Sequence, residues 1–171
     1  MSSSWKRNPD YWGTAGAGII PLAEDTGRFL VPLRSSYVNE PHTWGTIGGK
    51  LDTLDGEEGY NDETGRWVEM TEDPELEEPE DAAQREFEEE TGSDLPVELI
   101  ALYTFRDPAV GFTYYNFLGL IPEEFEPESN WETDEWAWVT LPELLALEPK
   151  HFGLKALLRD EPSVETLLRH A

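Results

Sequence analysis

The feature that most constrains this chain is the acidic segment at residues 82–92, AAQREFEEETG. In a helix, Glu86 lies four residues from Glu90 and three from Glu89, so the three carboxylates share one face. Like charges at these spacings repel one another. A hard divalent cation such as Mg²⁺ converts that repulsion into binding, because it prefers oxygen ligands. The spacing therefore predicts a helix whose acidic face holds a metal ion, and a solvated acidic face is the alternative for this run taken alone.

The sequence around this helix resembles a known signature. Residues 85–92, REFEEETG, preceded by Glu77, resemble the second part of the signature of the Nudix hydrolase family. Residues 44–50, WGTIGGK, resemble the Gly-Gly turn that opens the same signature. Between Gly49 and Glu77 lie 27 residues, where the family signature has five. The resemblance therefore predicts a Nudix protein with an insertion at about residues 51–76.

The resemblance implies a fold and an activity. The implied fold class is α/β (α+β), a Nudix-type α/β/α sandwich with a mixed β-sheet, in a single domain over residues 1–171. The implied enzyme is a Nudix pyrophosphohydrolase, a hydrolase acting on phosphorus-containing acid anhydrides. It would use Mg²⁺ or Mn²⁺ to cleave a pyrophosphate bond in a nucleoside diphosphate linked to another moiety, of the ADP-ribose, nucleotide-sugar or nucleoside triphosphate class.

Three other functions remain open at this stage. One is a non-catalytic Nudix-fold sensor that binds a nucleotide without cleaving it, although such a sensor has no need of the full carboxylate set. Another is a dinucleoside polyphosphate or RNA 5'-end pyrophosphohydrolase. The third is an acidic interaction protein whose charge is itself the function, which predicts binding to a basic partner that fades with salt.

The resemblance also implies site residues, position by position. The implied metal ligands are Glu86, Glu89, Glu90 and the backbone carbonyl of Gly48, and the implied catalytic residues are Glu89, Glu132 and Arg85. Arg85 is expected to pair with Glu77, although an ordinary i,i+4 pair with Glu89 also fits it. Residues 132–139, ETDEWAWV, resemble a downstream segment of bacterial RNA pyrophosphohydrolases in which a Glu serves metal binding or catalysis. Glu132 is therefore the predicted general base with Glu135 in reserve, and a plain loop acid is the alternative.

The predicted substrate-binding residues are Arg34, Trp44 and Tyr114. Arg34 ends an apolar run, where it would face a phosphate or simply lie at the surface. Trp44 and Tyr114 would stack on a base, although aromatic residues in strands more often belong to the core. Pro108 resembles a proline of the ADP-ribose pyrophosphatase group, but ordinary turn chemistry explains it equally well. His42 is interpreted as a loop residue and not as a catalytic base.

Local patterns predict the order of the secondary structure. Turn residues between two apolar runs favour a hairpin, and aromatic-rich runs favour strands. Pro79 and Gly92 suit the start and the end of the acidic helix. The expected strands are 15–22, 28–33, 44–50, 97–105, 112–121 and 136–139, and the expected helices after the acidic one are 141–147, 152–159 and 163–170.

Composition narrows the partners and the location. Acidic residues number 37 against 12 basic ones, which gives a net charge of −25. Such a charge argues against nonspecific binding to nucleic acids or anionic membranes. The chain has no cysteine, no apolar run long enough to cross a bilayer and no signal-peptide core at its start. These observations predict a cytoplasmic protein. The resemblance implies a small nucleotide as substrate, and a homodimer remains open.

Overall fold

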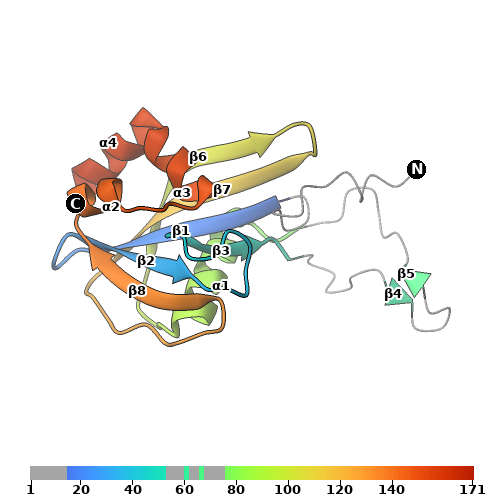
Figure 1. Cartoon of the computed structure of the whole chain (residues 1–171), viewed down its shortest axis with the longest axis horizontal. Helices are drawn as coiled ribbons and strands as arrows, with labels where there is room; N and C mark the ends of the chain where they lie inside the picture. Colours follow the sequence, from blue (N-terminus) through green and yellow to red (C-terminus); the bar gives the residue numbers. More distant parts are fainter. Residues whose placement is uncertain (1–14, 53–59, 62–65, 68–75) are drawn as a thin grey trace.

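The computed structural model describes residues 15–52, 60–61, 66–67 and 76–171 of the chain (Figure 1). The strands in these ranges are β1 (Ala15–Ala23), β2 (Arg28–Arg34), β3 (Ile47–Lys50), β4 (Tyr60–Asn61), β5 (Arg66–Trp67), β6 (Glu98–Asp107), β7 (Phe112–Ile121) and β8 (Thr133–Val139). The helices are α1 (Pro79–Thr91), α2 (Leu141–Ala146), α3 (Phe152–Arg159) and α4 (Glu161–His170). None of these helices is long and apolar enough to cross a membrane.

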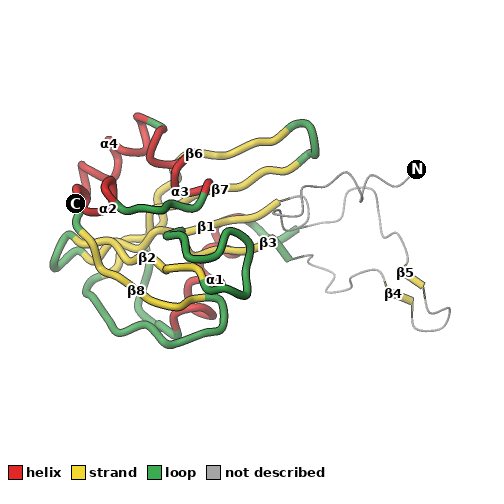
Figure 2. Tube along the Cα trace, viewed as in Figure 1, coloured by secondary structure: helices red, strands yellow, loops and turns green. Residues whose placement is uncertain are grey.

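The main sheet is mixed. Its strand order is β6-β7-β1-β2-β8, with β3 added beside β1. The β1 and β7 strands run parallel, and every other pair in this sheet is antiparallel. Helices cover both faces, as Figure 2 shows. The predicted α/β/α sandwich with a mixed sheet is therefore confirmed.

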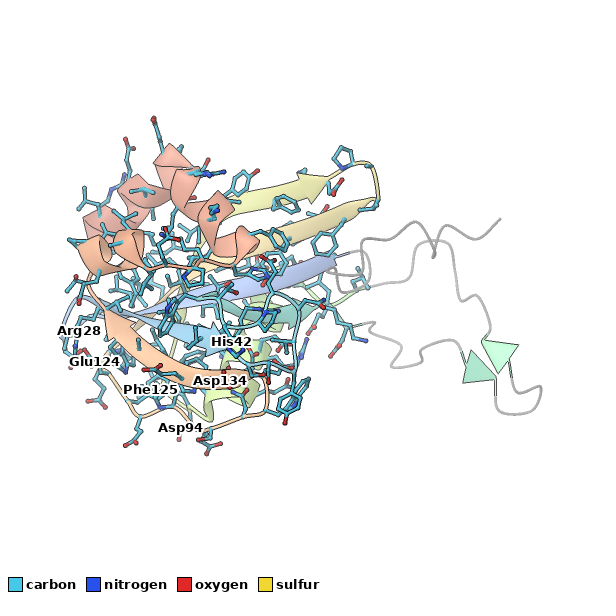
Figure 3. All side chains as sticks on the ribbon, viewed as in Figure 1. Arg28, His42, Asp94, Glu124, Phe125 and Asp134 are labelled. Carbon is cyan, nitrogen blue, oxygen red and sulfur yellow. The ribbon has the colours of Figure 1, made fainter. Side chains whose placement is uncertain are left out.

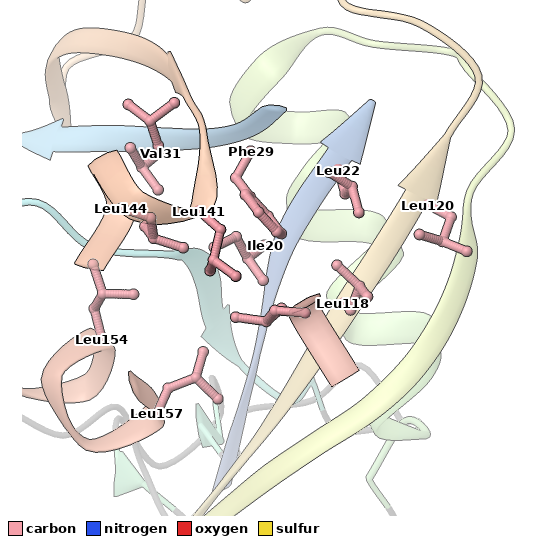
Figure 4. Packing of buried hydrophobic residues seen from close by; sticks show 12 residues of the cluster. Ile20, Leu22, Phe29, Val31, Leu118, Leu120, Leu141, Leu144, Leu154 and Leu157 are labelled. Carbon is pink, nitrogen blue, oxygen red and sulfur yellow. The ribbon is translucent and has the colours of Figure 1, made fainter. Parts of the chain in front are cut away.

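Two apolar clusters lie on opposite faces of the sheet, because alternate residues of a strand point to opposite sides. The first cluster packs β1, β2 and β7 against α2, α3 and α4 (Figure 4), and it includes Ile20, Leu22, Phe29, Val31, Leu118, Leu144 and Leu157. The second cluster packs the other face against α1, and it includes Ala17, Ile19, Leu30, Ile47, Ala82, Phe87 and Phe117. The helix α1 and the C-terminal helices are thus held on opposite sides of β1.

The sheet opens at a fork beside β1. The β1 strand pairs with β2 only at Leu22 and Ala23, whereas its earlier residues 16–19 pair with β3. The chain reaches β3 from β2 through residues 42–45, which hydrogen-bond to the inner edge of β2. We call the region between β2 and β3 the fork. On the side that faces the fork, the backbone N–H and C=O groups of β3 are not paired with another strand of the main sheet.

The helix α1 begins and ends where the sequence predicts. Pro79 is in its first turn, and two acidic residues follow at the positive end of the helix dipole. Gly92 adopts a φ of 73°, which suits glycine, and its N–H donates to the carbonyl of Glu88 at 2.9 Å. The buried face of α1 comprises Ala82, Ala83, Phe87 and Thr91. The carboxylates on the remaining faces are thereby presented to β3 and to solvent.

Several element boundaries differ from the sequence-based expectation. The β8 strand begins at Thr133, three residues earlier than predicted, because it pairs with the whole of β2. The β3 strand begins only at Ile47, since Trp44 forms isolated bridges instead. The short β4–β5 pair falls within the predicted insertion at about 51–76. The other residues of that insertion, 53–59, 62–65 and 68–75, lie outside the described residues, as do residues 1–14 of the predicted single domain.

Candidate active site

Arg85 ties α1 to the end of β3. Its Nη2 donates to Glu77 Oε1 at 2.6 Å and to the carbonyl of Lys50 at 3.1 Å. The backbone N–H of Asp52 donates to the same Glu77 oxygen at 2.8 Å, and the N–H of Glu77 donates back to the carbonyl of Asp52 at 2.9 Å. The hydrogen bond to Glu77 raises the pKa of Arg85. Burial acts to raise the pKa of Glu77, but the bonds from Arg85 and Asp52 outweigh it and lower that pKa. The predicted Arg85–Glu77 pair is confirmed.

The same guanidinium also gathers two carboxylates of α1. Arg85 Nη1 lies 3.0 Å from Glu86 Oε1 and 3.3 Å from Glu89 Oε2, so the alternative i,i+4 pair is present as well. The Glu86 side chain is mostly buried and Glu89 is largely exposed. Burial raises the pKa of Glu86, although Arg85 opposes the shift. Arg85 therefore holds both side chains beside β3.

Glu90 is the most deeply placed acid of the site. Its Oε2 is buried and has no hydrogen-bond partner among the described residues. Its carboxylate shares a hydrogen bond with the side chain of Glu132 and accepts another from the N–H of Gly48. Burial, the bond with Glu132 and the nearby charge of Glu86 raise the pKa of Glu90 well above its ordinary value. Carboxyl groups from α1 and from the residue before β8 thus meet at the fork, and the role of Glu132 as general base stays a prediction.

The geometry of β3 explains why Gly48 faces these acids. Hydrogen-bonded and non-hydrogen-bonded pairs alternate along antiparallel strands. Leu51 donates to the carbonyl of Ala15, so Gly48 belongs to a non-hydrogen-bonded pair with Gly18. The N–H and C=O of Gly48 therefore point away from β1, into the fork. Gly49 lies against Glu86, because a Cβ on Gly49 would overlap Glu86 Oε1. The glycines let α1 approach β3 closely.

Tyr114 lies under the site and not beside it. A Cβ on Gly18 or Gly48 would overlap the Tyr114 hydroxyl. The end of the Tyr114 ring therefore lies directly against the backbone of β1 and β3, where the two glycines have no side chains. The hydroxyl hydrogen-bonds Thr46, and burial together with the charge of Glu90 raises the pKa of Tyr114. One face of the ring stacks on Phe112 at a centroid distance of 6.3 Å. The Tyr114 hydroxyl therefore stays protonated and lies against the backbone of Gly18 and Gly48, and the predicted stacking of Tyr114 on a base stays a prediction.

Arg34 approaches the fork from the end of β2. Its Nε donates to the carbonyl of Asn39 at 2.8 Å, and its two Nη atoms make no hydrogen bond among the described residues. Burial lowers the pKa of Arg34, while the charges of Glu40, Glu132 and Glu90 act in the opposite direction. A guanidinium stays protonated in such a setting. Arg34 thus supplies a partly desolvated positive charge with free donors beside the acids.

Other predicted residues lie apart from this group. Trp44 packs against the first apolar cluster, which fits the alternative that it is a core residue. Its backbone N–H donates to the carbonyl of Pro149 at 2.9 Å. Glu135 alternates with Trp136 along β8 and so belongs to the face opposite α1. His42 is an exposed loop residue, as interpreted, with its Nδ1 3.4 Å from Asp134 (Figure 3). The structure brings none of these three side chains to Glu90.

Two residues near the site carry no signal in the sequence. His151 Nε2 lies 3.2 Å from Glu40 Oε2, although the two residues are far apart in the chain. Both flank Arg34. The charge of Glu40 is the largest that acts on Arg34, and burial together with the charge of Arg34 lowers the pKa of His151. From the sequence, a single His before a helix is interpreted as an N-cap, and His151 is indeed the N-cap of α3. Only the three-dimensional contact shows its second role.

The acids are not yet arranged as a finished set of metal ligands. Within the described ranges, no three acidic or histidine side chains stand in a geometry that holds a metal ion. The contacts explain this, because Arg85 engages Glu86 and Glu89 while Glu90 and Glu132 share a hydrogen bond. A divalent cation would have to displace these contacts with its own positive charge.

Comparison with known proteins identifies the family. The model of the NUDIX domain matches residues 13–160. No match was found among curated proteins. The fold is similar to a MutT Nudix hydrolase from Burkholderia pseudomallei, with a TM-score of 0.56 and 24% identity over 85% of this chain and 95% of that one. It is also similar to an Ap4A hydrolase from C. elegans, with a TM-score of 0.58 and 18% identity over 88% and 98% of the two chains.

A third similar structure is the Nudix domain of NrtR from Shewanella oneidensis complexed with ADP-ribose, with a TM-score of 0.57 and 15% identity over 98% and 99% of the two chains. Because the family model spans most of the sequence, the chain belongs to the Nudix family. The prediction of a Nudix pyrophosphohydrolase is confirmed at that level, and the general activity of the family is hydrolysis of pyrophosphate bonds in nucleotide derivatives. Enzymes of this family in general use divalent metal ions.

Proposed function

We propose that the chain is a Mg²⁺- or Mn²⁺-dependent hydrolase that cleaves the pyrophosphate bond of a nucleoside diphosphate linked to another moiety. The single observation that carries the proposal is the buried Oε2 of Glu90, which has no partner among the described residues. An acceptor left in this way costs about 1–3 kcal/mol. A cation is the partner that this oxygen lacks.

The surrounding groups fit a hard divalent ion. Glu90 and Glu132 meet in one hydrogen-bonded pair, and the charge of Glu86 acts on Glu90 from the same helix. The C=O of Gly48 points into the fork with its N–H, so it adds a neutral oxygen. All of these donors are oxygens, which Mg²⁺ and Mn²⁺ prefer. We assign Glu86, Glu89, Glu90 and the Gly48 carbonyl as the residues that would hold the ion.

The remaining residues position the reaction. A bound divalent ion supplies charge neutralisation of phosphate oxygens and lowers the pKa of a water molecule. Arg34 binds a phosphate oxygen through its free Nη donors, and Arg85 fixes Glu86 and Glu89 against β3. Glu132 accepts the proton of the attacking water at its carboxylate, since it contacts Glu90 from outside α1.

The substrate class follows from the same groups. We favour ADP-ribose, a nucleotide sugar or a nucleoside triphosphate, because Arg34 and an ion together suit a diphosphate and the net charge of −25 disfavours a polyanionic nucleic acid. The absence of cysteine from the sequence fits a reducing cytoplasm. Similar structures with other substrates, such as the Ap4A hydrolase, make dinucleoside polyphosphates the second class to test.

A substrate panel tests the proposal. The protein is incubated with ADP-ribose, a nucleotide sugar, nucleoside triphosphates, dinucleoside polyphosphates or 5'-triphosphorylated RNA, each with Mg²⁺, Mn²⁺ or EDTA, and products are separated by chromatography. We expect a nucleoside monophosphate to accumulate only when the metal is present. Tight binding with no product over hours at excess protein would instead identify a nucleotide sensor, and turnover in EDTA would refute the metal site.

A further inference from the structure

The guanidinium of Arg34 is held along one edge only. Its Nε donates to the Asn39 carbonyl at 2.8 Å, which leaves both Nη atoms without a hydrogen bond among the described residues. Two free parallel donors form the arrangement that binds a phosphate or a carboxylate in bidentate fashion. Any carboxylate nearby that is free to move therefore competes with the substrate for Arg34.

Glu40 is such a carboxylate. It exerts the largest of the charge effects that support the protonated form of Arg34. It lies in the loop that leaves β2, and its backbone adopts a φ of 47°, which strains a residue with a side chain. Its carbonyl accepts a hydrogen bond from the Thr43 hydroxyl at 2.7 Å, so the loop fixes its backbone. Among the described residues, the Glu40 carboxylate nevertheless pairs with His151 and forms no ion pair with Arg34.

His151 accounts for this separation. Its Nδ1 accepts the N–H of Gly153 at 3.1 Å, so the proton of the neutral ring is on Nε2. That atom lies 3.2 Å from Glu40 Oε2, so the ring and the carboxylate are in polar contact. The ring packs on Phe152 at a centroid distance of 4.5 Å, which fixes its orientation. Only 14% of the His151 side chain is exposed.

The backbone holds the two partners in register. Trp44, four residues after Glu40, bridges to Lys150, and the N–H of His151 donates to the Trp44 carbonyl at 2.8 Å. A Cβ on Gly45 would lie 3.6 Å from both Arg34 Cδ and His151 Cβ. The Arg34 and His151 side chains therefore lie on either side of Gly45, which has no side chain of its own. Arg34, Glu40 and His151 therefore form one local group at the fork.

We propose that His151 is a positioning residue, which binds the carboxylate of Glu40 and keeps it from occupying the phosphate-binding donors of Arg34. The inference rests on the proposed function, because it assumes that Arg34 binds a substrate phosphate. Without the His151 donor, Glu40 turns to Arg34 and forms a carboxylate–guanidinium pair in the place of the substrate. The effect is on substrate binding, and the chemical step is left unchanged.

The test uses His151→Asn. Asparagine still caps the Gly153 N–H, so α3 keeps its N-cap, but its side chain ends short of Glu40. We expect KM for the best substrate of the panel, and Kd for inorganic pyrophosphate with Mg²⁺ by calorimetry, to rise about tenfold, while kcat stays within about twofold. Adding Glu40→Ala to His151→Asn removes the competitor and should return KM and Kd to within about threefold of the original values.

The double variant separates positioning from a structural role. If His151 only supports the fold, the second substitution leaves the binding defect in place or deepens it, and the inference is wrong. His42→Asn is the matched control, because it changes an exposed histidine of the neighbouring loop that pairs with Asp134. If His151→Asn does not fold by circular dichroism, His151→Phe takes its place, since an aromatic ring keeps the contact with Phe152.

Failure of this inference and of the proposed function are distinguishable. If the unaltered protein hydrolyses its substrate and binds pyrophosphate, but KM and Kd do not change in His151→Asn, only the role of His151 is refuted. If the unaltered protein neither hydrolyses any member of the panel nor binds pyrophosphate, the proposed function fails and the inference fails with it.

Discussion

The substitution Glu90→Gln should make the metal-free protein more stable and the metal-bound protein inactive. Glutamine has the shape of glutamate but carries no charge, so burial and the charges of Glu86 and Glu132, which raise the pKa of Glu90, no longer act against the folded protein. It removes the charge of a buried carboxylate that is short of partners among the described residues, and such a group costs about 1–3 kcal/mol. For a chain of this size one kcal/mol shifts the melting temperature by about 2–4 °C, so we expect a rise of roughly 2 to 10 °C in EDTA.

The sign of the pH dependence follows from the raised pKa of Glu90. A carboxyl whose pKa is higher in the folded than in the unfolded protein stabilises the fold at low pH, where both states are protonated in full. That contribution to stability is lost as the pH rises through the pKa of the group in the folded protein. The melting temperature of the metal-free parent should therefore fall relative to that of Glu90→Gln as the pH is raised above the ordinary glutamate range.

Magnesium should reverse the order of the two proteins. An ion at a hundred times its Kd adds about 2.7 kcal/mol to the parent, and the variant should gain much less. The assay is thermal unfolding by fluorescence in EDTA and over a Mg²⁺ titration, with Glu88→Gln as control, since Glu88 is an exposed acid of the same helix. Equal melting temperatures in EDTA, or equal stabilisation of both proteins by Mg²⁺, would refute the reasoning.

Three further substitutions probe the rest of the site. Glu132→Gln should lower kcat by roughly 10²-fold with little change in KM, because it removes a base that acts in the transition state; an unchanged kcat in steady-state assays would exclude Glu132 as the base. Gly49→Ala places a methyl group on Glu86 Oε1, so we expect loss of activity and a lower melting temperature, and normal values of both would show that α1 has room to move. Arg34→Lys keeps the charge but not the two parallel donors, so KM should rise about tenfold, and an unchanged KM would remove Arg34 from the phosphate site.

Local signals in the sequence were enough to predict α1 and its two ends. The apolar spacing, Pro79 and Gly92 determine where the helix lies and ends, because each acts within a turn of its own position. The Arg85–Glu77 pair was predicted only through the family resemblance, since Glu77 lies before the helix and no helical spacing links it to Arg85 eight residues later. The same holds for Glu132, whose hydrogen bond with Glu90 joins β8 to α1.

Other features depend on pairings that a single sequence does not encode locally. The hairpin of β1 and β2 was predicted, but the parallel pairing of β1 with β7 was not, and that pairing places Tyr114 beside Gly16. Trp44 was selected as an aromatic residue next to a glycine turn, although its packing against the first cluster depends on helices near the C-terminus. The Glu40–His151 contact joins two unremarkable residues, and only the folded chain brings them together.

The reciprocal hydrogen bonds between Asp52 and Glu77 have a consequence for engineering. They join Asp52 to Glu77, so the two ends of the segment between β3 and α1 lie side by side. Lengthening a loop whose ends are joined costs only about 0.6 kcal/mol for each doubling. A foreign peptide or a small reporter inserted into the segment between Asp52 and Glu77 would thus leave the packing of α1 on β3 intact. This segment is therefore a permissive site for building a sensor of substrate binding.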